Sequence, residues 1–108
     1  MVNAVEIEKL RDYPGESVVM ESVIWRVPVP LRGSVHYFKY RLALVVDGVC
    51  VMRFDNEAGK GDHKHVDGIE SPYVFSGVRS LQRDFRLEAR GWLDRHPDVW
   101  RSLPGPDV

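Results

Sequence analysis

The dipeptide Asp47-Gly48 constrains the fold of this chain more than any other local feature of its sequence. It separates two runs that are rich in β-branched and apolar residues, 35–46 and 49–55. An Asp-Gly pair between two such runs is a strong signal for a two-residue β-hairpin turn, because both turn positions need positive φ angles. The sequence therefore predicts an antiparallel hairpin at the centre of the chain.

The turn also predicts which residues of the hairpin share a face. Regular pairing from this turn places Leu42 opposite Arg53 and Tyr40 opposite Asp55. Because side chains at every second position of a strand point the same way, Tyr40, Arg53 and Asp55 are expected on one face, with Arg41 on the other. A β-bulge in either strand would change this register.

The segments around the hairpin predict a mixed fold. We expect a short helix over 5–11, a strand over 18–29, a glycine-rich loop over 56–68 and a short strand over 73–75. Together with a C-terminal helix, these elements indicate the α+β class. The expected architecture is a curved antiparallel sheet of about four strands with an amphipathic helix packed on one face.

The C-terminal helix is predicted over 78–96, with Ser76 as its N-cap and Pro97 just after its end. Its apolar stripe is expected to pack on the sheet and contains Val78, Leu81, Phe85, Ala89 and Trp92. A second stripe is basic, and we call it the arginine stripe: Arg79, Arg83, Arg86 and Arg90. It is expected to face solvent, either as a plain solvated surface or as a surface for phosphates or an acidic partner.

Composition limits the domain count, the kind of partner, the disulfides and the compartment that can be expected. With 108 residues and 44% hydrophobic content, one domain over 1–108 is expected, with 1–16 and 98–108 peripheral. The net charge of −1 means that any RNA contact must come from a local patch. The lone Cys50 allows no disulfide and is expected to be buried. With neither a signal peptide nor a membrane span expected, the predicted compartment is the cytoplasm.

The segment 53–68 carries the densest set of polar side chains. Its two histidines suit general acid–base catalysis, because an imidazole ordinarily titrates near neutral pH. Metal-independent RNA cleavage needs an acid, a base and fixed cations for the crowded phosphate. The expected catalytic residues are His63, His65, Arg53 and Asp55. The expected phosphate- or RNA-binding residues are Arg41, Lys60, Lys64 and the arginine stripe, Arg79, Arg83, Arg86 and Arg90.

Other interpretations of this segment stay open. The two histidines could anchor a loop by hydrogen bonds and have no part in chemistry. They could also bind a divalent ion together with a carboxylate, Asp55, Asp62 or Asp67, because histidine and carboxylate ligands suit several divalent ions. The leading expectation needs no metal and no cofactor, and a metal-dependent phosphoesterase is one alternative to it.

Several motifs between residues 18 and 93 together resemble the TumE family, small prokaryotic proteins assigned as toxins of toxin–antitoxin pairs. The most specific are Asp55-Asn56, His63-Lys64-His65 and Pro72-Tyr73-Val74-Phe75. The resemblance implies an antitoxin partner, expected to be a helix-turn-helix DNA-binding protein. By analogy with other small toxins it also implies RNA as the target. The rival expectation is a non-catalytic protein that holds an acidic partner through the arginine stripe.

Overall fold

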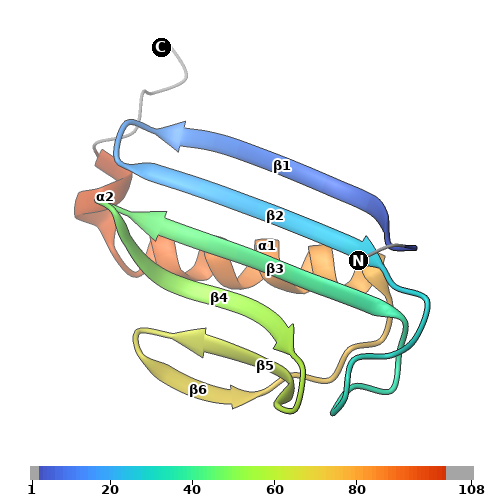
Figure 1. The fold of residues 1–108 in the computed structure, drawn as a ribbon. Helices are drawn as coiled ribbons and strands as arrows, with labels where there is room; N and C mark the ends of the chain where they lie inside the picture. The colour runs from blue at the N-terminus through green and yellow to red at the C-terminus, as the bar shows by residue number, and fades with distance from the viewer. Residues whose placement is uncertain (1–2, 102–108) are drawn as a thin grey trace.

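The computed structural model describes residues 3–101, and the side chains of residues 3–99. In this range the chain forms a six-stranded antiparallel sheet whose strands follow one another in sequence order, and then two helices (Figure 1). The strands are β1 (Val5–Gly15), β2 (Val18–Arg26), β3 (Phe38–Val46), β4 (Val49–Glu57), β5 (Gly61–Val66) and β6 (Ile69–Pro72). The helices are α1 (Val78–Asp94) and the short α2 (Pro97–Arg101). The α+β class is confirmed, but the described sheet has more strands than the expected number of about four.

Three segments fold differently from expectation. Residues 5–11 belong to β1, which pairs antiparallel with β2, so the predicted helix there is wrong. The predicted loop 56–68 contains the end of β4 and all of β5, and the predicted strand 73–75 is irregular. The physical reason is shared. Strand pairing overrides local preference, because a charged segment such as 61–66 gains its backbone hydrogen bonds from the neighbouring strands β4 and β6.

A second Asp-Gly turn, Asp67-Gly68, joins β5 to β6. Its φ angles are +51° and +83°, close to the +50° and +77° of Asp47-Gly48, so both turns have the positive angles of a type I′ turn. The turn places His65 opposite Glu70. The signal that predicted the central hairpin was therefore present here too, in a segment whose charges had indicated a loop.

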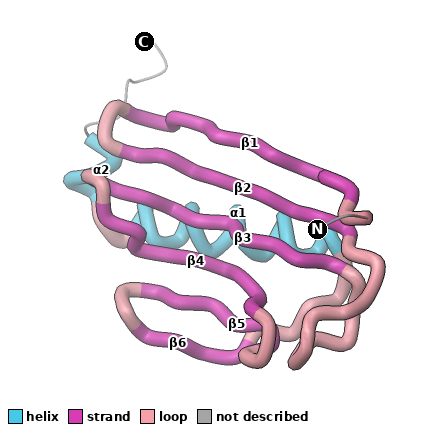
Figure 2. The backbone as a smooth tube through the Cα atoms, viewed as in Figure 1, coloured by secondary structure: helices cyan, strands magenta, loops and turns pink. Residues whose placement is uncertain are grey.

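Helix α1 covers one face of the sheet (Figures 1 and 2). Its apolar stripe is buried as predicted at Leu81, Phe85, Ala89 and Trp92, and packs with the core residues of the strands. All four residues of the arginine stripe are exposed, which confirms the predicted helical register.

The predicted ends of α1 are corrected. The N-cap is Gly77 and no side chain caps the helix, so the prediction of Ser76 as N-cap is wrong. Gly77 has φ +132°, a conformation that glycine adopts far more readily than serine, which moves the helix start by one residue. At the other end α1 stops at Asp94, two residues before the predicted end.

A bulge changes the register of the β3–β4 hairpin. Pairing at the turn is as expected, but a shift between Leu44 and Val45, where Val51 of β4 is the extra residue, places Arg41, and not Tyr40, opposite Asp55. Tyr40 is buried in the core under α1, so its predicted place on the same face as Arg53 and Asp55 is wrong. Because one extra residue reverses the facing of every later side chain, Arg41 joins Arg53 and Asp55 on the face that α1 does not cover.

The remaining expectations concern Cys50, membrane-spanning helices and the chain ends. Cys50 is exposed, not buried, because it lies opposite Val45 on the face of the sheet away from α1. Within residues 3–101, neither helix has the length and apolar composition needed to span a bilayer. Of the segments expected to be peripheral, residues 1–2 and 102–108 lie outside the described residues, and the single domain over 1–108 stays a prediction.

Candidate functional site

Polar side chains gather on the helix-free face of the sheet, across β4, β5 and β6. Strand pairing places Asp55 opposite His63, Arg53 opposite His65, and Glu70 on the other side of His65. Because residues two apart in a strand share a face, these side chains lie together. We call Arg53, Asp55, His63, His65 and Glu70 the open-face cluster. The structure thus brings together all four residues that the sequence predicted as catalytic.

Asp55 is the buried centre of the cluster. Its Oδ2 lies 2.9 Å from Arg53 Nε, and its Oδ1 lies 2.7 Å from His63 Nε2. The other ring nitrogen of His63, Nδ1, lies 3.1 Å from the carbonyl oxygen of Gly61. A carbonyl oxygen can only accept, so Nδ1 carries the hydrogen. Both nitrogens of His63 therefore have protein neighbours, and neither is free to exchange a proton with a substrate.

His65 is the histidine of the cluster that a substrate can reach. Its side chain is 26% exposed, against 7% for His63, and the two rings meet edge to face with centroids 4.9 Å apart. Its Nε2 lies 3.2 Å from Glu70 Oε1. Arg53 is partly exposed beside it, and Arg41 is exposed on the next strand. The open face therefore presents one accessible imidazole with two cations nearby.

Three buried polar atoms of the cluster have no hydrogen-bond partner among the described residues: Arg53 Nε, Asp55 Oδ1 and His65 Nε2. Each has an oppositely charged or chargeable neighbour at 2.7–3.2 Å, but the donor and acceptor directions do not meet the geometry of a hydrogen bond. Ligand atoms of Asp55, His63 and His65 all lie within 4.8 Å of one another. These three residues could therefore hold a cation.

A separate polar network lies on the helix side of the sheet, around Asp62. Its carboxylate accepts hydrogen bonds from the hydroxyls of Ser34 (2.6 Å) and Tyr40 (2.8 Å) and lies 2.6 Å from His36 Nε2. Burial raises the pKa of Tyr40 above its ordinary value, and the bond to Asp62 raises it further, so the hydroxyl stays a donor. The ring of His36 stacks on Phe75 at 3.8 Å. This network fastens the 27–37 segment to β5, and it removes Asp62 from the candidate ligands of the open-face cluster.

The remaining predicted phosphate-binding residues do not join the cluster. Lys64 points to the helix side and pairs with Glu88 of α1, and Lys60 is exposed in the turn before β5. The arginine stripe is exposed on α1, across the sheet from the cluster, and Arg86 of this stripe lines the cavity between α1 and β1. Asp67 lies in a turn, where it accepts a hydrogen bond from the indole N–H of Trp92 (2.9 Å). Of the predicted phosphate binders, Arg41 lies opposite Asp55, and Lys60 lines a small cavity together with His63 and Glu70.

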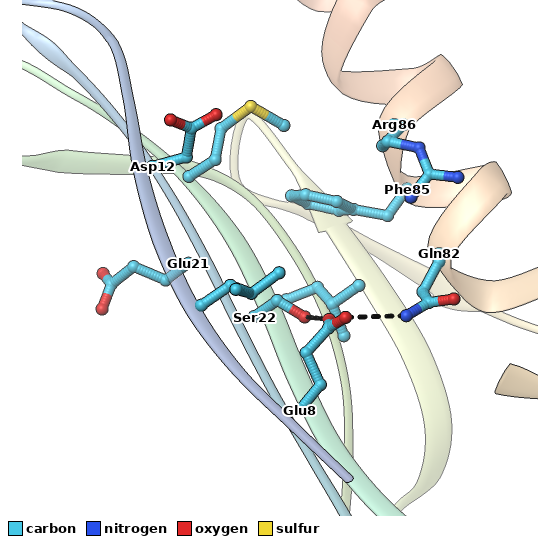
Figure 3. A pocket seen from close by; sticks show the side chains of 10 residues that line it. Glu8, Asp12, Glu21, Ser22, Gln82, Phe85 and Arg86 are labelled. Atoms are coloured by element: carbon cyan, nitrogen blue, oxygen red, sulfur yellow. Dashed lines mark hydrogen bonds between the residues drawn. The ribbon is translucent and has the colours of Figure 1, made fainter. Parts of the chain in front are cut away.

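Two features were missed from the sequence. Glu70 was missed because the Asp67-Gly68 turn was not recognised, although its dipeptide was a usable signal. The other is a cavity of about 140 Å³ between β1, β2 and α1 (Figure 3). There Glu8 accepts hydrogen bonds from the hydroxyl of Ser22 and from Nε2 of Gln82 (2.8 Å), which ties β1 to α1. It could not be foreseen while residues 5–11 were expected to form a helix.

The fold and the cluster together define a small α+β protein with a helix on one face of an antiparallel sheet and a charged candidate site on the other. The family model described as Toxin TumE matches residues 2–93. The chain therefore belongs to the TumE toxin family, which confirms the resemblance seen in its sequence, and membership of a toxin family implies an antitoxin partner. No curated protein and no solved structure matches the chain.

Proposed function

We propose that this TumE-family chain is a toxin that cleaves RNA, and that the open-face cluster is its active site. The observation that carries the proposal is the convergence of His65, Glu70 and the buried Asp55–His63 pair beside the cations Arg53 and Arg41. Guanidinium groups match the geometry of phosphate, and fixed positive charge stabilises the negative charge that develops when a phosphodiester bond breaks.

The geometry does not favour the two-histidine scheme expected from the sequence. A general acid–base pair needs two groups with a nitrogen or oxygen that can meet the substrate. His63 is buried and has protein neighbours at both ring nitrogens. Of the two rings, the partly exposed ring of His65 is the one that RNA can approach, although its Nε2 is buried beside Glu70. In this proposal Asp55 and His63 are positioning residues, and Arg53 and Arg41 hold the scissile phosphate.

The proposal predicts that the purified chain cleaves single-stranded RNA in a buffer that contains divalent ions. His65→Gln is expected to lower the rate by about 10²–10⁴-fold, the range for loss of a group that takes part in the chemical step. Cleavage of a fluorescently labelled oligonucleotide measures the rate. His96→Gln is the matched control, because His96 stacks on Trp92 away from the cluster, and its rate should stay within about twofold of the unmodified chain. An equal rate for His65→Gln and His96→Gln, or no cleavage by the unmodified chain, would contradict the proposal.

The arginine stripe supports a second proposed role, recognition of an acidic surface on the antitoxin. Its four guanidinium groups are exposed, and Arg83 has a loose contact to Asp84 (3.7 Å) of the same helix. Such contacts are worth little and are easily replaced by those of a partner. The expected partner, a helix-turn-helix DNA-binding protein, remains part of this proposal.

This role predicts that the double substitution Arg83→Glu, Arg86→Glu weakens the complex with the antitoxin by several kcal/mol, because like charges then face one another. The fold should survive, since both side chains lie in solvent. Titration calorimetry against the antitoxin measures the effect, with the exposed Lys9→Glu on β1 as the control. Weaker RNA binding with a shallower salt dependence would instead assign the stripe to RNA. If neither affinity moves beyond about twofold, the stripe has no recognition role.

A further inference from the structure

We infer that the open-face cluster binds one divalent transition-metal ion. Its ligands are Asp55 Oδ1, His63 Nε2 and His65 Nε2, with Glu70 Oε1 in an exchangeable fourth position. Imidazole and carboxylate ligands together suit Zn²⁺ and other first-row divalent ions. The inference rests on the proposed function only for the use of the ion, which would polarise a phosphate oxygen or activate a water molecule. Binding itself does not require RNA to be the substrate.

The orientation of His63 is the first argument. Its Nδ1–H is directed to the carbonyl oxygen of Gly61, so in the neutral ring Nε2 carries a lone pair. That lone pair lies 2.7 Å from Asp55 Oδ1, which is also an acceptor. Two acceptors at this distance need a positive charge between them, either a proton or a metal ion. A backbone carbonyl that fixes the far nitrogen is the usual arrangement for a metal-bound histidine.

The buried atoms without hydrogen bonds favour a metal ion over a proton as the positive charge between His63 and Asp55. Asp55 Oδ1 and His65 Nε2 both lack a hydrogen-bond partner among the described residues. Leaving a buried polar atom unsatisfied costs about 1–3 kcal/mol. A proton on His63 could satisfy only Asp55, and His65 Nε2 would need a second proton, shared with Glu70 at 3.2 Å. A metal ion satisfies both atoms at once.

The separations of the ligand atoms fit a single ion. Ligand atoms at about 2.0–2.2 Å from a tetrahedral zinc lie about 3.3–3.6 Å from one another. The observed separations are 2.7 Å from His63 Nε2 to Asp55 Oδ1, 3.2 Å from His65 Nε2 to Glu70 Oε1, and 3.9 Å from His63 Nε2 to Glu70 Oε1. The ligand atoms of Asp55, His63 and His65 all lie within 4.8 Å of one another, so side-chain rotations must draw the wider pairs closer to the ion.

The surroundings keep one position accessible. The side chain of Glu70 is 53% exposed and can be displaced by a substrate oxygen. A cavity of about 190 Å³ is lined by His63, Glu70 and Lys60. Arg53 lies against Asp55 Oδ2, which leaves Oδ1 for the ion. A catalytic ion needs an open coordination position for its substrate, here next to fixed cations. A purely structural ion does not need such a position.

The test is a Zn²⁺ titration of the full chain after dialysis against chelator, by calorimetry and without RNA. We expect one ion per chain and a rise in melting temperature on addition of Zn²⁺. His65→Gln should weaken binding by about 100-fold or more, since loss of an outer-shell partner alone costs about 10–100-fold. His96→Gln is the matched control and should bind as tightly as the unmodified chain. His65 and Glu70 are chosen because they are partly exposed, so their variants should fold, and Glu70→Gln should weaken binding by about tenfold.

The outcomes separate this inference from the proposed function. Absence of stoichiometric Zn²⁺ binding, or equal binding by His65→Gln and His96→Gln, would overturn the inference, and the charge between His63 and Asp55 would then be a proton. RNA cleavage that persists in chelator would support the proposed function while overturning the role of the ion. Tight binding that depends on His65, without cleavage of any RNA, would support the metal site and refute the proposed function.

Discussion

Replacing Phe85 with alanine is expected to lower the free energy of unfolding by about 3–5 kcal/mol. The side chain is 3% exposed, meets the ring of Phe54 edge to face with centroids 5.7 Å apart, and lines the cavity beside Glu8 and Gln82. Truncation would enlarge this cavity, and rigid strands on one side limit how far the neighbours can close it. Urea denaturation followed by circular dichroism measures the change.

Two substitutions on the outer side of α1 serve as controls for the Phe85 prediction. Leu87 is 65% exposed, so Leu87→Ala removes apolar atoms from the same helix without opening a cavity. Arg83→Ala removes an exposed charge. Both are expected to change stability by about half a kcal/mol or less. A loss at Leu87 as large as that at Phe85 would show that α1 does not pack as described.

Replacing Asp55 with alanine is the second change expected to have a large effect, a loss of about 3–5 kcal/mol measured in chelator. Asp55 is 5% exposed, and it lies 2.9 Å from Arg53 and 2.7 Å from His63. Removal of one partner leaves the other charge or polar group buried without compensation, which costs more than the pair itself contributes. The same variant should lose any stabilisation by Zn²⁺.

The matched control for Asp55 is Asp94→Ala on α1. The side chain of Asp94 is 60% exposed and lies 3.8 Å from Arg90, a surface contact expected to contribute about 0–1 kcal/mol. Comparison of the two variants by denaturation separates the effect of burial from the loss of a carboxylate. If both variants are equally stable, the open-face cluster is not held by Asp55, and the positioning role given to this residue fails.

Much of the fold could be predicted from short sequence patterns. The Asp47-Gly48 turn, the flanking strands and the apolar stripe of α1 follow from angles and periodicities that involve residues only a few positions apart. The structure confirms these features. The spacing of His63 and His65 likewise determines that both lie on one face once β5 is a strand. The family resemblance also came from such short motifs, and the family model bears it out.

Other features had no local signal. Residues 5–11 combine charged and apolar residues in a pattern compatible with helix or strand, and only pairing with β2 decides for the strand. The bulge at Val51 of β4 turns Arg53 and Asp55 away from the buried face of Tyr40 and onto the face of Arg41. Its cause is the fit of β3 and β4 against their neighbours and α1, and the free energies of alternative registers differ through contacts that local sequence does not contain.

The sequence by itself therefore determined the turns, the α+β class, the family and the identity of the polar residues in the candidate site. Only the tertiary structure decided how those residues could act. It placed His63 between Gly61 and Asp55, left His65 accessible, added Glu70, and put Lys64 on the other face. The physical reason is the separation along the chain of the residues that interact. Turn angles and helical periodicity depend on neighbours in the chain, whereas burial, charge pairing and strand register depend on segments that meet only in the folded protein.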